Sequence, residues 1–244
     1  MILSAKTDKG LKRENNQDAY SFGELVPDAC YAVVCDGMGG AAEGETASNE
    51  CARIVSERIT NGYSSGMSDL AIKSLLTGAV DYANKYVYSL SLTDKKYEGM
   101  GTTIVASIVT EKCAYVVHAG DSRAYLLNPD SGEIIQITKD HSVVQKMIED
   151  GEITAEEAVT HPKKNLITRA VGVDGEVKTD FCQEDVSSGD ILLLCSDGLT
   201  NYSQTSDLLV AARDASLDEY TEKLVSTAIG NGGGDNVTVV AVRV

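Results

Sequence analysis

The sequence is poor in the residues that usually mark linkers and large aromatic cores. Its 244 residues include no Trp, two Phe and three Pro, so the core must be built from aliphatic side chains and some of the 11 Tyr. No repeat, low-complexity tract or Pro-rich linker divides the chain. A chain of this length can bury a large core without help from a metal or disulfides. We therefore expect one domain that spans residues 1–244.

Basic side chains are also scarce, because 21 Lys and Arg stand against 37 Asp and Glu and give a net charge of −16. Clustered Lys and Arg bind nucleic acid and anionic membranes, so neither is expected as a partner. The N-terminus "MILSAKTDKG" lacks the apolar segment of a signal peptide, and no apolar run approaches ~18 residues. We expect a cytoplasmic monomer whose acidic surface attracts divalent cations.

The cysteines show no metal-binding or disulfide spacing. Six are scattered along the chain without a C-x-x-C pair, and most lie within apolar runs. A free cysteine in such a run packs as a small hydrophobic side chain. Neither a zinc site nor a disulfide framework is therefore expected.

Two helical patterns occur early in the chain. Residues 44–60 carry apolar side chains at helical spacing on one face. Ser68 is a candidate N-cap for a second helix. The first stripe consists of Ala47, Cys51, Ile54, Val55 and Ile59, and the second of Leu70, Leu75, Leu76, Ala79, Val80, Ala83 and Val87.

After Gly99 the chain becomes rich in short β-type runs joined by turns of a few residues, such as "TTIVASIVT" and "CAYVVHAG". Such short connections favour antiparallel hairpins. A polar helical pattern covers 141–158, and the rest of the chain predicts two strands (177–184, 190–196), two helices (206–214, 217–229) and a closing strand, "NVTVVAVRV". Two mainly antiparallel sheets flanked by helices would use all these pieces, which predicts an α+β fold, a four-layer α-β-β-α sandwich.

Four aspartates share one setting, each beside glycine at the edge of a strand-like run: Asp36 in "VVCDGMGG", Asp121 in "VVHAGDSRAY", Asp197 in "LLLCSDGLT" and Asp235 in "GNGGGDNVTVV". A single Asp-Gly pair is most simply a turn. Four in this setting favour a shared site. The sequence has no calcium-loop spacing and no Gly-Lys-[Ser/Thr] after "GMGG", so a calcium loop and a nucleotide cradle are both disfavoured.

Oxygen-only ligands select hard cations, so Mg²⁺ or Mn²⁺ is the expected occupant of a site built from these acids. Two such ions can bridge a water, lower its pKa and direct it at a phosphorus atom. The phosphate then needs a cation of its own. Arg13, in the polar stretch "KRENNQDAY", has the planar fork that binds phosphate through two hydrogen bonds, although alone it would be taken as a solvated loop charge.

From its first predicted strand to its last, the chain resembles the metal-dependent (PPM, type two-C) Ser/Thr protein phosphatases, especially their compact bacterial members. Eight stretches carry the resemblance in order: "GLKRENNQDAY", "VVCDGMGGAAEGETAS", "GMGTTIVASIV", "VHAGDSRAYLL", "KDHSVVQKMIEDGEIT", "HPKKNLITRAVG", "GDILLLCSDGLT" and "GGGDNVTVVAV". The resemblance implies the same α-β-β-α sandwich and a mobile flap at about 142–164.

The resemblance also implies roles for individual residues. Asp36 would bridge two metal ions, and the Gly37 carbonyl would bind one of them. Asp197 and Asp235 would hold the other ion, and Asp18 would act through a metal-bound water. Two further implied roles are a weaker third ion on Asp121 with Asp197, and a substrate phosphate held by Arg13.

The sequence departs from the family where a histidine that donates a proton to the leaving group is often found. The two usual positions are Met38 and Ala41. The histidines that are present, His118, His141 and His161, lie elsewhere and are expected to be structural. We hypothesise that a water protonates the leaving group, since loss of a general acid typically costs ~10²–10⁴-fold in rate.

The sequence therefore predicts an enzyme that hydrolyses phosphoserine and phosphothreonine by in-line attack of a metal-bridging water. Its expected partners are phosphorylated proteins, including a Ser/Thr protein kinase and the substrates of that kinase. Two alternatives stay open at this point. One is a pseudophosphatase, a module that binds phosphopeptides without turnover, and the other is a metal phosphohydrolase that acts on small molecules.

Overall fold

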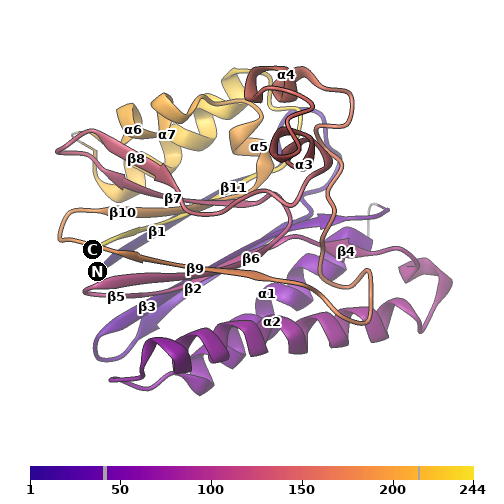
Figure 1. Ribbon diagram of the computed structural model, residues 1–244, viewed down its shortest axis with the longest axis horizontal. Coiled ribbons are helices and arrows are strands. Elements are labelled where there is room, and N and C mark those ends of the chain that lie inside the picture. The colour runs from indigo at the N-terminus through magenta and orange to yellow at the C-terminus, as the bar shows by residue number, and fades with distance from the viewer. Residues whose placement is uncertain (41–42, 214) are drawn as a thin grey trace.

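Two antiparallel sheets form the centre of the computed structural model, which describes residues 1–40, 43–213 and 215–244. The first, here the β1 sheet, has the order β1 (Ile2–Asp8), β11 (Val237–Arg243), β10 (Ile191–Cys195), β7 (Arg123–Asn128) and β8 (Glu133–Gln136). The second, the β2 sheet, has the order β2 (Asp18–Leu25), β3 (Ala29–Met38), β5 (Ile104–Thr110), β6 (Cys113–Ala119) and β9 (Asp180–Asp185), with β4 (Gly101–Thr102) paired to β3. The sheets stack face to face (Figure 1).

Helices cover the outer face of each sheet, as Figure 1 shows. The β2 sheet is covered by α1 (Glu43–Gly62) and α2 (Asp69–Ser91), and a 3₁₀ turn, η1 (Lys95–Tyr97), follows α2. The β1 sheet is covered by α5 (Asp197–Thr200), α6 (Thr205–Ala212) and α7 (Leu217–Gly230). Among the described residues, no helix combines the length and apolarity needed to cross a membrane. The predicted α-β-β-α sandwich is confirmed.

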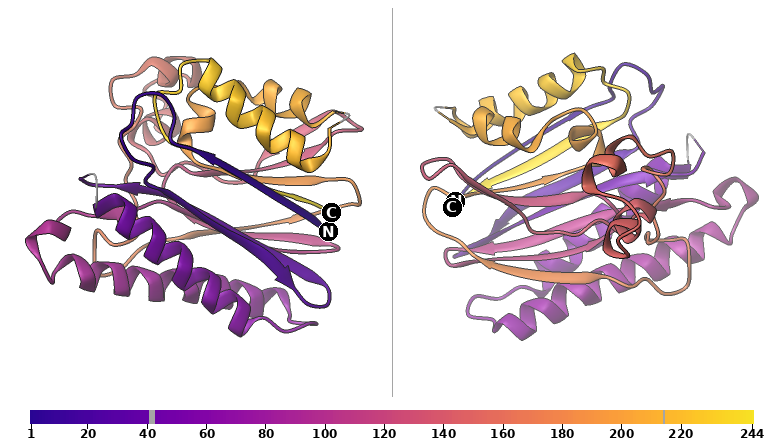
Figure 2. Two further views of the ribbon diagram at one scale, coloured as in Figure 1. Left: turned by 180° about the vertical axis from the view of Figure 1, so that it is seen from behind. Right: turned by 45° about the horizontal axis from the view of Figure 1, so that its top comes forward.

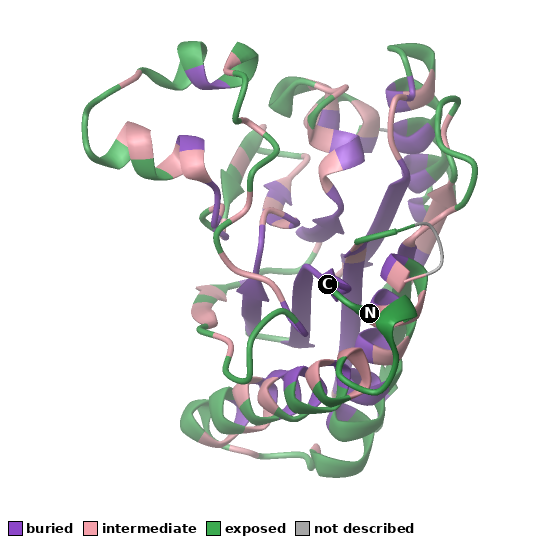
Figure 3. Ribbon diagram, turned by 90° about the vertical axis from the view of Figure 1, so that its right-hand side faces the viewer, coloured by how far each residue is buried: buried purple, intermediate pink, exposed green. Residues whose placement is uncertain are grey.

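Strand β3 shows how the sequence forms these layers. Side chains alternate between the two faces of a strand. Ala32 and Val34 belong to the apolar cluster between the sheets, while Val33 and Cys35 belong to the cluster under α1 and α2. Both faces are buried, which explains the continuous apolar run, and Figure 3 shows such buried strands between helices that carry both buried and exposed residues. The alternation assigns Asp36 to the face between the sheets.

The short helices α3 (Val143–Glu149) and α4 (Ala155–Thr160) lie outside the four layers at one end of the sandwich. Figure 2 shows them at the same end as the loop between β1 and β2. The two ends of the segment that contains α3 and α4 are paired with each other. Ser142 forms a β-bridge with Ile167, and the Val143 N–H donates to the Leu166 carbonyl (2.8 Å). We call residues 142–164 the α3–α4 segment.

Some local predictions were wrong. Leu70 is 72% exposed, because it lies on the opposite side of α2 from the buried stripe, to which Ile72 (2% exposed) belongs instead. The pattern over 141–158 forms two helices, since α3 ends at Glu149 with Asp150 as its C-cap, and Thr154 caps α4 with a capping box. The N-cap at Ser68 is confirmed. The last position of the predicted helix 206–214 lies outside the described residues.

Candidate active site

Six of the seven predicted site residues line one cavity of about 230 Å³ at the end of the sandwich. They are Arg13, Asp36, Gly37, Asp121, Asp197 and Asp235. The seventh, Asp18, lies directly opposite Asp36 in the pairing of β2 with β3. Directly opposed residues share one face of a sheet, so both carboxylates face the space between the two sheets. Acids that are far apart in the sequence thus meet where β3, β6, β10 and β11 begin or end.

Asp18 is held from the β1 sheet. The Ser196 hydroxyl donates to Asp18 Oδ2 (2.7 Å) and accepts from the Thr238 N–H (2.9 Å). Ser196 follows β10, and the alternation of that strand turns its side chain toward the other sheet. This hydroxyl therefore connects the two sheets beneath the cavity.

The hydroxyls of Thr103 and Ser122 form a pair that holds the backbone of Asp36. The Asp36 N–H donates to Thr103 Oγ1 (3.0 Å), which lies 2.7 Å from Ser122 Oγ. Ser122 follows Asp121, so the pair connects the two acids' backbones. Gly37 has a steric role, since a Cβ at this position would overlap the carbonyl oxygen of Gly44.

Arg13 and Asp235 form a two-point ion pair. Arg13 Nη2 donates to Asp235 Oδ2 (2.8 Å), and Nε lies 2.8 Å from Oδ1. The hydrogen bond to Asp235 raises the pKa of Arg13 above its ordinary value. Because a guanidinium has five N–H donors, others remain for a bound anion. Arg13 is thus fixed at the cavity wall with its side chain 51% exposed.

The carboxylates oppose each other's ionisation. Burial, reinforced by Asp18, raises the pKa of Asp36 well above its usual value. Burial raises the pKa of Asp18 to about 7, and burial with the charge of Asp235 raises that of Asp197 to about 6. The pKa of Asp121 rises to about 7 for the same reasons, burial and the Asp197 charge. So many acids in one place stay ionised at neutral pH only with a compensating positive charge.

Two carboxylate oxygens, unpartnered in the described part of the chain, indicate whether a metal ion fits this site. Asp18 Oδ1 and Asp197 Oδ1 are both buried, and neither has a hydrogen-bond partner among the described residues. Burying such an atom without a partner is costly. The ligand set consists of oxygen atoms, which suits Mg²⁺ or Mn²⁺. The residues therefore fit a hard divalent cation.

Met38 and Ala41 stand at the two positions where a proton-donating histidine is expected. Met38 lines the cavity, whereas Ala41 lies outside the described residues. No histidine is among the described residues that line the cavity. His161 lies at the end of α4, where its Nδ1 accepts from the Lys163 N–H (3.1 Å).

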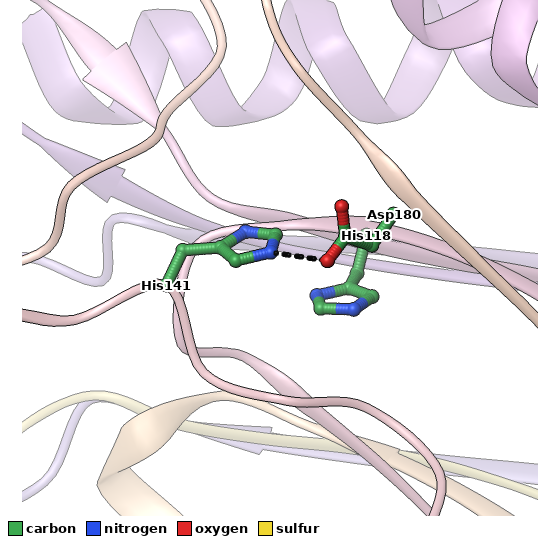
Figure 4. Close-up of side chains that lie close together, drawn as sticks. All are labelled: His118, His141 and Asp180. Carbon is green, nitrogen blue, oxygen red and sulfur yellow. Dashed lines mark hydrogen bonds and ion pairs between the residues drawn. The ribbon is translucent and has the colours of Figure 1, made fainter. Parts of the chain in front are cut away.

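His118 and His141 form a cluster that the sequence analysis did not find, since their partner Asp180 comes from a distant strand (Figure 4). The two rings stack with centroids 4.6 Å apart. His141 Nδ1 accepts from the Gly120 N–H (3.1 Å), which leaves the proton on Nε2, and Nε2 lies 3.2 Å from Asp180 Oδ2. Gly120 precedes Asp121, so this hydrogen bond helps to hold the backbone that carries Asp121 at the cavity.

These three side chains have ligand atoms within 4.8 Å of one another, but a cation already occupies their meeting point. Arg169 Nη1 lies 2.9 Å from His141 Nε2 and donates to Asp180 Oδ1 (2.8 Å). Stacked rings also direct their in-plane lone pairs along parallel planes, so these do not converge on one ion. We interpret the cluster as structural.

His118 gives a prediction for the pH dependence of stability. Burial lowers its pKa from 6.5 to about 4. A histidine with a lowered pKa stabilises the fold fully above pH 6.5, and this contribution is lost as the pH falls toward 4. We expect the free energy of unfolding of the wild type to fall by roughly 3 kcal/mol more than that of His118→Phe between pH 7 and pH 4. Urea titrations at several pH values, run in EDTA, measure the difference, and parallel pH profiles would contradict the prediction.

The fold and the cavity define a class, the phosphohydrolases that hold divalent cations with carboxylates. The family model described as protein phosphatase 2C matches residues 11–231. The serine/threonine phosphatase stp of Listeria welshimeri is 35% identical over 246 residues, which cover 100% of this chain and 96% of that protein. The chain belongs to the protein phosphatase 2C family.

Solved structures agree with this assignment. The serine/threonine phosphatase Stp1 from Staphylococcus aureus has a TM-score of 0.91 and 32% identity, covering 99% of this chain and 94% of that one. The catalytic domain of the serine/threonine protein phosphatase PstP, solved in complex with two manganese ions, has a TM-score of 0.84 and 34% identity, covering 98% and 96%.

Proposed function

We propose that this protein is a metal-dependent phosphatase that hydrolyses phosphoserine and phosphothreonine in proteins. The observation that carries the proposal is the convergence of Arg13 and four aspartates at one cavity, with Asp18 opposite Asp36 and two buried carboxylate oxygens left without partners among the described residues. Both sheets contribute to this cavity, so we treat residues 1–244 as one catalytic domain.

Each of the five aspartates receives a role in this proposal. Asp36 and the Gly37 carbonyl, with Asp197 and Asp235, would hold two Mn²⁺ or Mg²⁺ ions. Asp18 would act through a bound water, and Asp121 with Asp197 would hold a weaker third ion. When bound, the ions acidify water and neutralise phosphate charge.

The chain's own residues orient the substrate. Arg13, fixed by Asp235 at the cavity wall, would bind the phosphate oxygens with the N–H groups that the ion pair leaves available. Because no histidine lines the cavity among the described residues, a water would donate the proton to the leaving serine or threonine oxygen.

A second cavity supports a polypeptide as the substrate. It measures about 310 Å³ and shares Met38 and Ile167 with the first. A cavity that adjoins the site in this way can accept the residues that flank a phosphorylated side chain, which a small-molecule substrate would not need.

We extend the proposal to partners and compartment. The substrates would include a Ser/Thr protein kinase and the proteins that it phosphorylates. Six free cysteines suit a reducing compartment such as the cytoplasm. We propose that the protein acts there as a monomer.

The direct test is release of phosphate from a phosphothreonine peptide and from an aryl phosphate, with the full chain in EDTA and after addition of Mn²⁺. We expect both substrates to be hydrolysed only with the metal. Hydrolysis of the aryl phosphate alone would favour a small-molecule phosphohydrolase. Binding of the peptide without turnover of either substrate would identify a pseudophosphatase.

A further inference from the structure

Asn201 contacts Asp197 twice. It follows the single turn of α5, which begins at Asp197. Its backbone N–H donates to the Asp197 carbonyl (2.8 Å), and its side-chain Nδ2 donates to Asp197 Oδ2 (2.9 Å). The other carboxylate oxygen, Oδ1, is the buried one without a partner among the described residues. Asn201 thus fixes one oxygen of Asp197 and leaves the other for the cavity.

Lys164 determines which way the Asn201 amide points. Its Nζ donates to Asn201 Oδ1 (3.2 Å). An ammonium group only donates and a carboxylate only accepts, so the amide oxygen must face Lys164 and the NH₂ must face Asp197. A flipped amide would place two donors together at one end and two acceptors together at the other.

Lys164 is the last residue of the α3–α4 segment. A cavity of about 340 Å³ separates this segment from α5 and α6, and Lys164 and Asn201 both line it. A change in the position of the segment would move the Lys164 ammonium relative to the Asn201 amide.

We propose that Asn201 is a positioning residue that orients Asp197 for divalent-cation binding, and that Lys164 couples this orientation to the position of the α3–α4 segment. This inference rests on the proposed metal-binding role of Asp197. Groups that orient a metal ligand typically change metal affinity 10–100-fold when they are removed. The α3–α4 segment would thereby influence cation affinity without supplying a ligand.

The test is calorimetric titration of the full chain with MnCl₂ in the absence of substrate. We expect Asn201→Ala to weaken Mn²⁺ binding about tenfold. Lys164→Met is expected to weaken it about threefold in the wild-type background and to cause no weakening when Asn201 is alanine. Such non-additivity is the signature of two residues that act as a unit.

The sign of the Lys164→Met effect separates the relay from plain electrostatics. Removing a positive charge near a cation site by itself strengthens cation binding. Lys163→Met is the matched control. It removes a neighbouring positive charge, and the described hydrogen bonds include none between the Lys163 side chain and Asn201. Asn231→Ala is the control for loss of an exposed amide, since Asn231 donates to the Tyr202 carbonyl and not to an acid. Both controls should leave Mn²⁺ affinity within about twofold.

Three results would overturn the inference: unchanged Mn²⁺ affinity in Asn201→Ala, tighter binding in Lys164→Met, or effects that multiply in the double variant. Thermal unfolding in EDTA checks that each variant is folded, and Lys164→Met, on the surface, keeps the test valid if Asn201→Ala is unstable. Failure of the wild type to bind Mn²⁺ or to hydrolyse the phosphothreonine peptide would instead contradict the proposed function.

Discussion

Replacing Asp36 by asparagine is expected to lower kcat/KM for a phosphothreonine peptide by ~10³-fold or more, because the proposed cation site would lose the charge of a central ligand. Asp36 faces Asp18 across the strand pair and lines the cavity with Asp197. The asparagine keeps the shape of the side chain. Steady-state kinetics at saturating Mn²⁺, with calorimetric titration of Mn²⁺, should show loss of turnover together with weaker binding.

The same substitution should stabilise the protein in EDTA. Burial and neighbouring carboxylates raise the pKa of Asp36, so its ionised form costs free energy near pH 8. Asparagine removes that charge, and we expect the free energy of unfolding to rise by about 1–2 kcal/mol. The control is Asp190→Asn, which alters a buried acid that accepts from Asn128 and from the Ser187 N–H. This control should lower stability and keep kcat/KM within about threefold, whereas retained activity in Asp36→Asn would contradict the assignment.

The strand pattern carried most of what could be predicted. An apolar run that ends in an acid, as in "YAVVCDG", indicates a strand buried on both faces whose next residue reaches the edge of the sheet. Strand alternation then places Asp36 between the sheets, and the register of β2 adds Asp18. The alternation of side chains along a strand is a local property, so it can be recognised in a single sequence.

The supporting groups could not be predicted in the same way. Ser196 contacts Asp18, which is 178 residues away in the sequence. Asn201 lies only four residues after Asp197, yet its position depends on α5, a helix of one turn that has no recognisable period. Turn-length elements and long-range polar contacts are decided by packing, which local pattern does not encode.

The buried histidines show the same limit of prediction from local sequence pattern. The sequence shows His118 in a β-type run and His141 before a helix, and nothing near them indicates Asp180 or Arg169 as partners. The pairing of β6 with β9, which sets His118 opposite Asp180, joins segments about 60 residues apart. The stretches that carry the family resemblance contain His118, His141 and Arg169 but not Asp180, and none of them indicates that these side chains meet.

Replacing Arg13 by alanine is expected to lower kcat/KM for the phosphothreonine peptide about 10²–10³-fold and to weaken inhibition by inorganic phosphate about tenfold or more. The reason is the loss of a charged donor pair for phosphate at the cavity wall. Arg13→Lys should recover only part of the activity, because an ammonium group lacks the planar fork. Lys12→Ala is the control, since it removes the adjacent exposed charge, and it should change kcat/KM less than about twofold.

The effect on the metal should have the opposite sign to that expected at Lys164. Arg13 forms a two-point ion pair with Asp235, so its positive charge opposes cation binding at that acid. Calorimetry should therefore show Mn²⁺ bound as tightly or up to about fivefold more tightly in Arg13→Ala, although activity is lost. Weaker Mn²⁺ binding in this variant would mean that Arg13 positions Asp235 for the metal, and an unchanged inhibition constant for phosphate would exclude it from substrate binding. Tighter metal binding with weaker phosphate binding is the combination that requires Arg13 to act on the substrate.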